Sequence, residues 1–79
     1  MSCSLELALD RAEGALLRVL GTIERRGWNV LSVNAASTSH EYTVSVTLDG
    51  VRDPETLCRQ LQRLVDVREV RLLSESPTG

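Results

Sequence analysis

The sequence contains no lysine and no phenylalanine, and it has a single histidine, His40. Without lysine, Schiff-base chemistry and a phosphate-loop lysine are excluded. The only aromatic residues are Trp28 and Tyr42, too few for the stacking platform that single-strand nucleic-acid binders use. The formal net charge of −2 gives no basic footprint for DNA or RNA. We therefore expect no nucleic-acid partner.

The two cysteines, Cys3 and Cys58, are far apart and form neither a CxxC motif nor a metal-binding spacing. We expect two reduced thiols packed as small hydrophobic side chains, rather than a disulfide or a ligand pair. No stretch approaches the roughly 18 apolar residues of a membrane helix. Charged residues such as Asp10 interrupt the N-terminal apolar residues, which argues against a signal peptide. The expectation is a cytoplasmic protein with no membrane partner.

No catalytic set can be assembled from the sequence. His40 falls in a turn between two predicted strands, where a solvated loop residue is favoured over a general base. None of the serines lies in a nucleophile-elbow sequence, and the pattern places no two carboxylates opposite each other. We therefore expect no catalytic residues, no metal site and no cofactor in this chain.

The apolar periodicity predicts four strands and two helices. Period-two alternation places strands over residues 3–9, 42–48 and 67–73, and a fourth, less regular strand covers 28–37. In that strand Val30 is out of step with Leu31, Val33 and Ala35, which either a bulge or a strand apolar on both faces would explain. One helix begins at Ala15 and the other at Asp53–Pro54, a capping residue followed by a proline. The apolar stripe of the second helix contains Leu57, Cys58, Leu61, Leu64 and Val65.

The resulting order, β-α-β-β-α-β, predicts an α+β fold of the ferredoxin-like type. Right-handed crossovers give a four-stranded antiparallel sheet in the order 4-1-3-2, with both helices on one face. We expect one domain over residues 1–73 and a disordered polar tail over 74–79. The second strand is then an apolar, nearly uncharged edge, which predicts pairing with another chain.

The turn from Asp10 to Gly14 connects the first strand to the start of a helix. Free amides and the positive dipole end at a helix start can hold a carboxylate or a phosphate. Gly14 would let a ligand approach the backbone closely. The alternative is that Gly14 only shapes a tight turn.

Three runs of residues resemble the ACT domain, and most closely the small subunits of acetolactate synthase. They are EGALLRVL from Glu13 to Leu20, RRGWNVLSV from Arg25 to Val33, and LQRLVDVREV from Leu61 to Val70. The resemblance covers roughly Leu5 to Leu73. With one ACT unit, the chain is similar to the short, single-domain small subunits.

The resemblance implies a regulatory subunit that binds and activates the large catalytic subunit in branched-chain amino-acid biosynthesis. Thiamine diphosphate, Mg²⁺ and FAD are then expected in that partner. In the family, an effector such as valine binds at the interface of a homodimer formed through the second strand. The implied effector site here comprises Arg11, Gly14, Ala15 and Asn29. Because Arg11 stands where the family has asparagine, it can close the site or pair with a ligand carboxylate.

The contact surface with the catalytic subunit is not given by any motif. Arginines favour interfaces, and on that ground we place it at Arg59 and Arg63 on the second helix. The alternative is an ordinary solvated helix face.

An alternative function is a free-standing dimeric amino-acid sensor. An acylphosphatase-like enzyme is disfavoured because its phosphate-cradling loop is missing.

Overall fold

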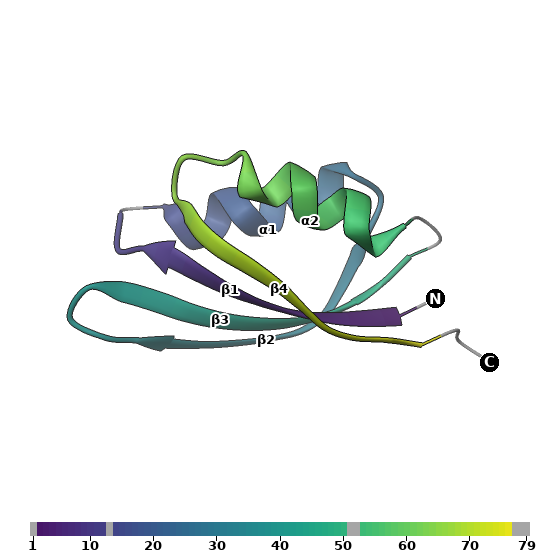
Figure 1. The fold of residues 1–79 in the computed structure, drawn as a ribbon, viewed down its shortest axis with the longest axis horizontal. Coiled ribbons are helices and arrows are strands. Elements are labelled where there is room, and N and C mark those ends of the chain that lie inside the picture. Colours follow the sequence, from purple (N-terminus) through teal and green to yellow (C-terminus); the bar gives the residue numbers. More distant parts are fainter. Residues whose placement is uncertain (1, 13, 51–52, 77–79) are drawn as a thin grey trace.

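The computed structural model describes residues 2–12, 14–50 and 53–76. Four antiparallel strands form one sheet in the order β2-β3-β1-β4, which confirms the predicted order (Figure 1). The central strands β1 (Ser2–Asp10) and β3 (Glu41–Asp49) pair along their whole length, from Ser2 with Asp49 to Asp10 with Glu41. Helices α1 (Ala15–Arg25) and α2 (Pro54–Gln62) lie side by side on one face of the sheet. The fold is therefore ferredoxin-like.

The core lies between the helices and the covered face of the sheet. Along β1 every second residue is buried, because one face of the strand meets the helices and the other is open. Leu5, Leu7 and Leu9 are buried completely or nearly so. They pack with aliphatic side chains of β3, α1 and α2, and with Trp28. An aliphatic core of this kind explains why the chain needs so few aromatic residues.

Helix α2 begins at the residue that the sequence predicts. Asp53 accepts a hydrogen bond from the backbone N–H of Glu55 at 3.1 Å, and Pro54 occupies the first helical position. Helix α1 begins differently, because its first residue follows Gly14 in a left-handed conformation with φ of 77°. A residue with a side chain is strained at that angle. The backbone of Gly14 thus explains the glycine without reference to a ligand.

The edge strand β2 (Asn29–Ser37) contains the predicted bulge. Its register with β3 shifts between Val30 and Ser32, which places Val30 on the same face as Val33 and Ala35. Leu31 is the extra residue and is 60% exposed. All of β2 except Val30 is exposed, so the strand leaves an open edge.

Two predictions about the end of the chain are wrong. Helix α2 stops at Gln62, and Val65 is not part of its apolar stripe but is 89% exposed in the following turn. Strand β4 (Val67–Ser76) continues past Leu73, and Ser74 pairs with Ser4 of β1. The expected disordered tail is therefore strand as far as Ser76. Residues 77–79 lie outside the described part of the chain.

The two cysteines are placed as the sequence predicts. Both cysteines are thiols, with Cys3 buried and Cys58 half-buried on α2. Burial, followed by the charges of Glu55 and Asp53, raises the pKa of the Cys58 thiol above its ordinary value. Over the residues described, neither helix has the length and apolar character needed to cross a membrane.

Candidate functional site

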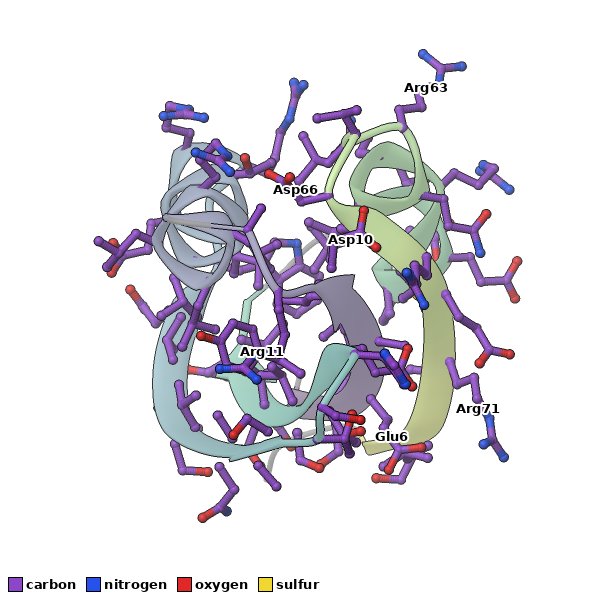
Figure 2. All side chains as sticks on the ribbon, turned by 90° about the vertical axis from the view of Figure 1, so that its left-hand side faces the viewer. Glu6, Asp10, Arg11, Arg63, Asp66 and Arg71 are labelled. Atoms are coloured by element: carbon purple, nitrogen blue, oxygen red, sulfur yellow. The ribbon has the colours of Figure 1, made fainter. Side chains whose placement is uncertain are left out.

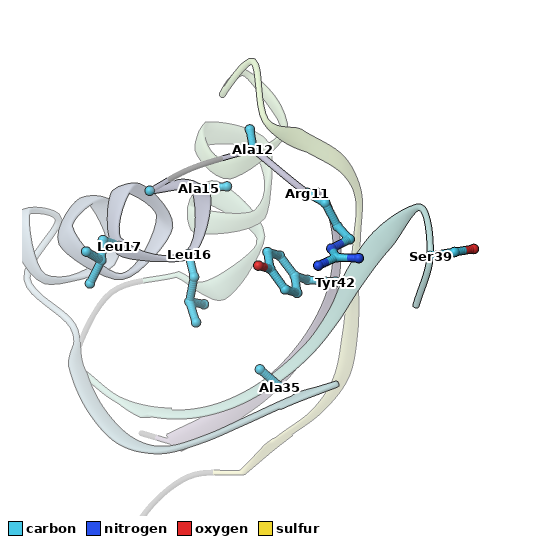
Figure 3. A pocket seen from close by; sticks show the side chains of 9 residues that line it. Arg11, Ala12, Ala15, Leu16, Leu17, Ala35, Ser39 and Tyr42 are labelled. Atoms are coloured by element: carbon cyan, nitrogen blue, oxygen red, sulfur yellow. The ribbon is translucent and has the colours of Figure 1, made fainter. Parts of the chain in front are cut away.

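A hollow of about 730 Å³ lies beside the start of α1 (Figure 3). The β1–α1 loop, α1, β2 and the β2–β3 hairpin all contribute to its wall. The lining residues are Arg11, Ala12, Gly14, Ala15, Leu16, Leu17, Ala35, Ser39 and Tyr42. Most of these side chains are small or aliphatic, and among the residues that the structure describes Arg11 is the charged one. The hollow therefore suits a small ligand with an aliphatic body and a negatively charged end.

The start of α1 adds to the attraction for an anion. Among the described residues no side chain caps the helix at Gly14, and the first turn contains no acidic residue. The backbone N–H of Ala15 donates to the carbonyl of Ala12 at 3.1 Å, which closes the loop tightly before the helix. An uncapped helix start keeps its positive dipole end, which favours a carboxylate or phosphate nearby. Glu13, in the middle of this loop, lies outside the described residues.

Arg11 is exposed and is held by two contacts of its own. Its Nη1 donates a hydrogen bond to the backbone carbonyl of Thr38 at 3.1 Å. Its guanidinium carbon lies 5.6 Å from the centre of the Tyr42 ring, within the range of a cation–π contact. Figure 3 shows the guanidinium next to the Tyr42 ring. A ligand carboxylate would have to compete with these contacts or join them.

The proposed effector residues do not all come together within one chain. Arg11, Gly14 and Ala15 line the hollow, but Asn29 does not. Asn29 pairs with Asp49 at one end of the sheet, whereas Ser37 pairs with Tyr42 at the end that carries the hollow. The eight residue-to-residue steps from Asn29 to Ser37 span roughly 26 Å of extended strand. Only another chain can therefore bring an Asn29 side chain near this hollow.

The sequence did not reveal how the β1–α1 loop is held in place. Asp66, in the α2–β4 turn, is 8% exposed and contacts both sides of the loop. Its backbone carbonyl accepts a hydrogen bond from the N–H of Asp10 at 2.8 Å. Its Oδ2 accepts a hydrogen bond from Arg18 Nε at 2.6 Å and forms an ion pair with Nη2 of the same guanidinium, also at 2.6 Å. The Leu-Val-Asp-Val run indicated a turn at this place in the sequence. Nothing in the sequence pattern predicts that Arg18 and Asp66, which are 48 positions apart, form a pair.

A second ion pair lies on the open side of the loop. The carboxylate of Asp10 accepts a hydrogen bond from Arg68 on β4, and Glu41 lies 3.5 Å from the same guanidinium. These carboxylates raise the pKa of Arg68 above its ordinary value, with the Asp10 hydrogen bond as the largest cause. Arg68 is exposed, so the pair orients the side chains more than it stabilises the fold.

The two arginines predicted as a partner surface are both exposed, but they differ in setting. Arg59 lies on α2, and its Nη2 donates to Thr56 Oγ1 at 3.4 Å. Arg63 follows the helix and extends away from the body of the domain (Figure 2). The contacts of the described residues do not identify either arginine as part of an interface.

The described residues bring neither His40 nor a set of metal ligands to the hollow. His40 is exposed at the tip of the β2–β3 hairpin, where its backbone N–H donates to Thr38 Oγ1 at 3.3 Å. Across residues 2–12, 14–50 and 53–76, no three His, Cys, Asp or Glu side chains gather as a metal-ligand set. The described arrangement is suited to binding a ligand or another chain.

Residues 11–70 match the model of a protein family described as the ACT domain. Among curated proteins, the acetolactate synthase small subunit of Haemophilus influenzae is 36% identical over 74 residues, covering 90% of this chain. The chain spans only 45% of that relative's length. The acetolactate synthase isozyme 2 small subunit of Escherichia coli is 35% identical over 66 residues, which cover 81% of this chain and 76% of the relative.

Solved structures share the fold at lower sequence identity. The acetolactate synthase small subunit of Thermotoga maritima superimposes with a TM-score of 0.79 at 20% identity, covering 91% of this chain and 47% of the other. The ACT domain of the GTP pyrophosphokinase of Chlorobium tepidum gives a TM-score of 0.76 at 16% identity, with 92% and 97% covered. At such identities the likeness concerns the fold alone.

Proposed function

This chain belongs to the ACT domain family, and from that premise we propose that it is a non-catalytic regulatory subunit of an acetolactate synthase. It binds the large catalytic subunit and raises the activity of that subunit in branched-chain amino-acid biosynthesis, in the cytoplasm. The similarity to the E. coli isozyme 2 small subunit carries the proposal, because this chain covers three quarters of that protein. The hollow beside α1 supports it, since it fits a small effector.

The chemistry of the reaction belongs to the partner in this proposal. Thiamine diphosphate, Mg²⁺ and FAD reside in the catalytic subunit and supply the decarboxylation and carboligation steps. The small chain contributes binding energy only. By binding the active conformation more tightly than the inactive one, it shifts the partner toward the active state. A difference of about 1.4 kcal/mol in binding is enough for a tenfold change in population.

Two copies of the chain pair through β2 in this proposal. The edge is open, and Leu31 and Val33 on it are 60% and 37% exposed. An antiparallel pair of β2 strands centred on Val33 would place Asn29 of the second copy opposite Ser37 of the first. Ser37 pairs with Tyr42, which lines the hollow. A homodimer would therefore bring the missing Asn29 to the end of the sheet where the effector site lies.

The proposed effector is a branched-chain amino acid such as valine. Its carboxylate would lie at the start of α1 near Gly14 and Ala15, and its aliphatic body would contact Leu16 and Ala35. Arg11 weakens this binding, because its guanidinium lies against Tyr42 and repels the ligand's ammonium group. We therefore propose that activation of the partner is the main function, and that the response to valine is weak or absent.

Reconstitution tests the proposed function. Purified catalytic subunit is assayed for acetolactate formation with increasing amounts of this chain, which should have no activity alone. We expect turnover to rise and then saturate. If saturating amounts change neither turnover, nor cofactor affinity, nor thermal stability of the catalytic subunit, the regulatory-subunit proposal fails. The second candidate, a free-standing dimeric amino-acid sensor, would then be favoured by the hollow and the open β2 edge.

A further inference from the structure

Val65 is the most exposed of the large hydrophobic side chains that lie on the surface of the described residues, at 89%. It lies in the turn between α2 and β4, just beyond Arg63 and Leu64. The adjacent Leu64 is partly buried against the core, so the chain places one aliphatic side chain inside and the next one outside. A single exposed valine is common in proteins. Val65 differs from such a residue in the structure that surrounds it.

The turn that carries Val65 is fixed on both sides. The N–H of Leu64 donates to the carbonyl of Leu61, and the N–H of Val67 donates to the carbonyl of Leu64, each at 3.1 Å. Asp66, the next residue, is bound to Asp10 through its backbone and to Arg18 through its carboxylate. Val65 is therefore held in place before any partner arrives. A preorganised contact loses little conformational entropy on binding.

Positive charge flanks the turn although the chain as a whole has a net charge of −2. Arg63 is exposed and takes part in no ion pair within the part of the chain that the structure describes. Arg18 keeps 53% of its side chain exposed while it binds Asp66. Figure 2 looks onto this end of the domain and shows Arg63 extending outward above Asp66 and Asp10. An exposed apolar centre with arginine at its rim is the composition typical of protein interfaces.

The position of the turn favours the catalytic subunit as the occupant over a second copy of this chain. A second copy is proposed to cover β2, whose exposed apolar residues are Leu31 and Val33. The α2–β4 turn follows α2 and leads into β4, the strand on the opposite edge of the sheet, so both contacts can form at once. Through Asp66 the turn is also bound to Asp10 and Arg18, which flank the loop that lines the hollow on either side. A partner seated here would contact the element that holds this loop.

We propose that the α2–β4 turn, with Val65 at its centre and Arg63 at its rim, is the surface that docks on the catalytic subunit. The complementary site is an apolar socket with an acidic rim. This inference rests on the proposed function and shifts the expected contact from the face of α2, at Arg59, to the turn that follows the helix. The open β4 edge, with Leu73 52% exposed, is the competing surface.

Four variants of the full chain are titrated into the catalytic subunit, with activation and direct binding as readouts. Val65→Glu places a negative charge opposite the acidic rim of the proposed socket. Val65→Arg removes the apolar contact but adds a positive charge, which the acidic rim would attract. Leu73→Glu is the matched control on another exposed hydrophobic residue. Val65→Ser is the milder change should Val65→Glu fail to fold, as judged by circular dichroism.

We expect Val65→Glu to raise the concentration for half-maximal activation by about tenfold or more. Val65→Arg and Val65→Ser should raise it less, and Leu73→Glu should behave as the unchanged chain. The docking surface is refuted if Val65→Glu binds as the unchanged chain does, or if Leu73→Glu weakens binding equally. If the unchanged chain itself neither binds nor activates, both the docking surface and the proposed function fail. Activation that is insensitive to Val65 leaves the proposed function intact.

Discussion

Arg18 and Asp66 form an ion pair that joins the first turn of α1 to the turn after α2. Both Nε and Nη2 of the guanidinium lie 2.6 Å from the same carboxylate oxygen. Arg18 also lies close to Gly14. A Cβ on residue 14 would lie 3.1 Å from Nη1 of Arg18, which is a tight approach. This ion pair therefore joins α1, on one side of the β1–α1 loop, to the turn that bonds to Asp10 on the other side, and the positive φ accounts for glycine at residue 14.

Replacing Asp66 with asparagine should destabilise the domain by about 1–3 kcal/mol, because it removes the charge from a mostly buried carboxylate bonded to Arg18. Half of Arg18 is exposed to solvent, which keeps the effect below that of a fully buried pair. Urea unfolding followed by circular dichroism measures it. Glu69→Gln, an exposed change on β4, is the control. Equal unfolding midpoints for Asp66→Asn and the unchanged chain would contradict this role.

Gly50 should not tolerate alanine. A Cβ on Gly50 would lie 2.6 Å from Cε3 of the buried Trp28 ring, closer than packed atoms approach. Forcing extra volume into a packed core costs about 1–3 kcal/mol. The control is Gly21→Ala in α1, where the new Cβ would lie 3.8 Å from Arg25 Nη1 and helix propensity improves. Thermal unfolding should show opposite shifts, and a neutral Gly50→Ala would mean that Trp28 can move.

Valine should bind weakly or not at all to this chain, and Arg11→Asn should strengthen the binding. The substitution removes the guanidinium from the face of Tyr42 and supplies a neutral hydrogen-bonding group. Titration calorimetry compares both proteins with Arg59→Asn, which changes the same charge far from the hollow. Binding near ~1 µM by the unchanged chain, worth about 8 kcal/mol, would show instead that Arg11 pairs with the ligand carboxylate.

The chain should dimerise through β2 at concentrations of about 10–100 µM, where modest interfaces form. Val33→Arg should shift it to monomer, because two arginines would then meet at the centre of the strand pair. Gln62→Arg on α2 adds the same charge on another exposed surface and should leave the dimer unchanged. Light scattering reports the mass. A monomer for the unchanged chain, alone and with its partner, would count against this assembly.

Much of the fold can be predicted from the sequence because the signals are local. Alternation along β1 and β3, and the Asp53–Pro54 start of α2, depend on residues within one element. The bulge at Val30 was also visible, as a break in the alternation of a single strand. Strand order then follows from the handedness of two crossovers. Gly14 and Arg11 could be placed together because both lie in one short turn, whereas their proposed role in effector binding came from the resemblance to the ACT domain.

The sequence by itself thus determined the elements, their order and the loop that lines the hollow. The tertiary structure alone decided which distant residues meet. Arg18 finds Asp66 across 48 positions, and Trp28 excludes a side chain at Gly50. It also decided where elements end, since α2 stops three residues before Val65 and β4 pairs with β1 as far as Ser76. Periodicity encodes which face of an element is apolar, whereas contacts between elements depend on packing and register that no single stretch contains.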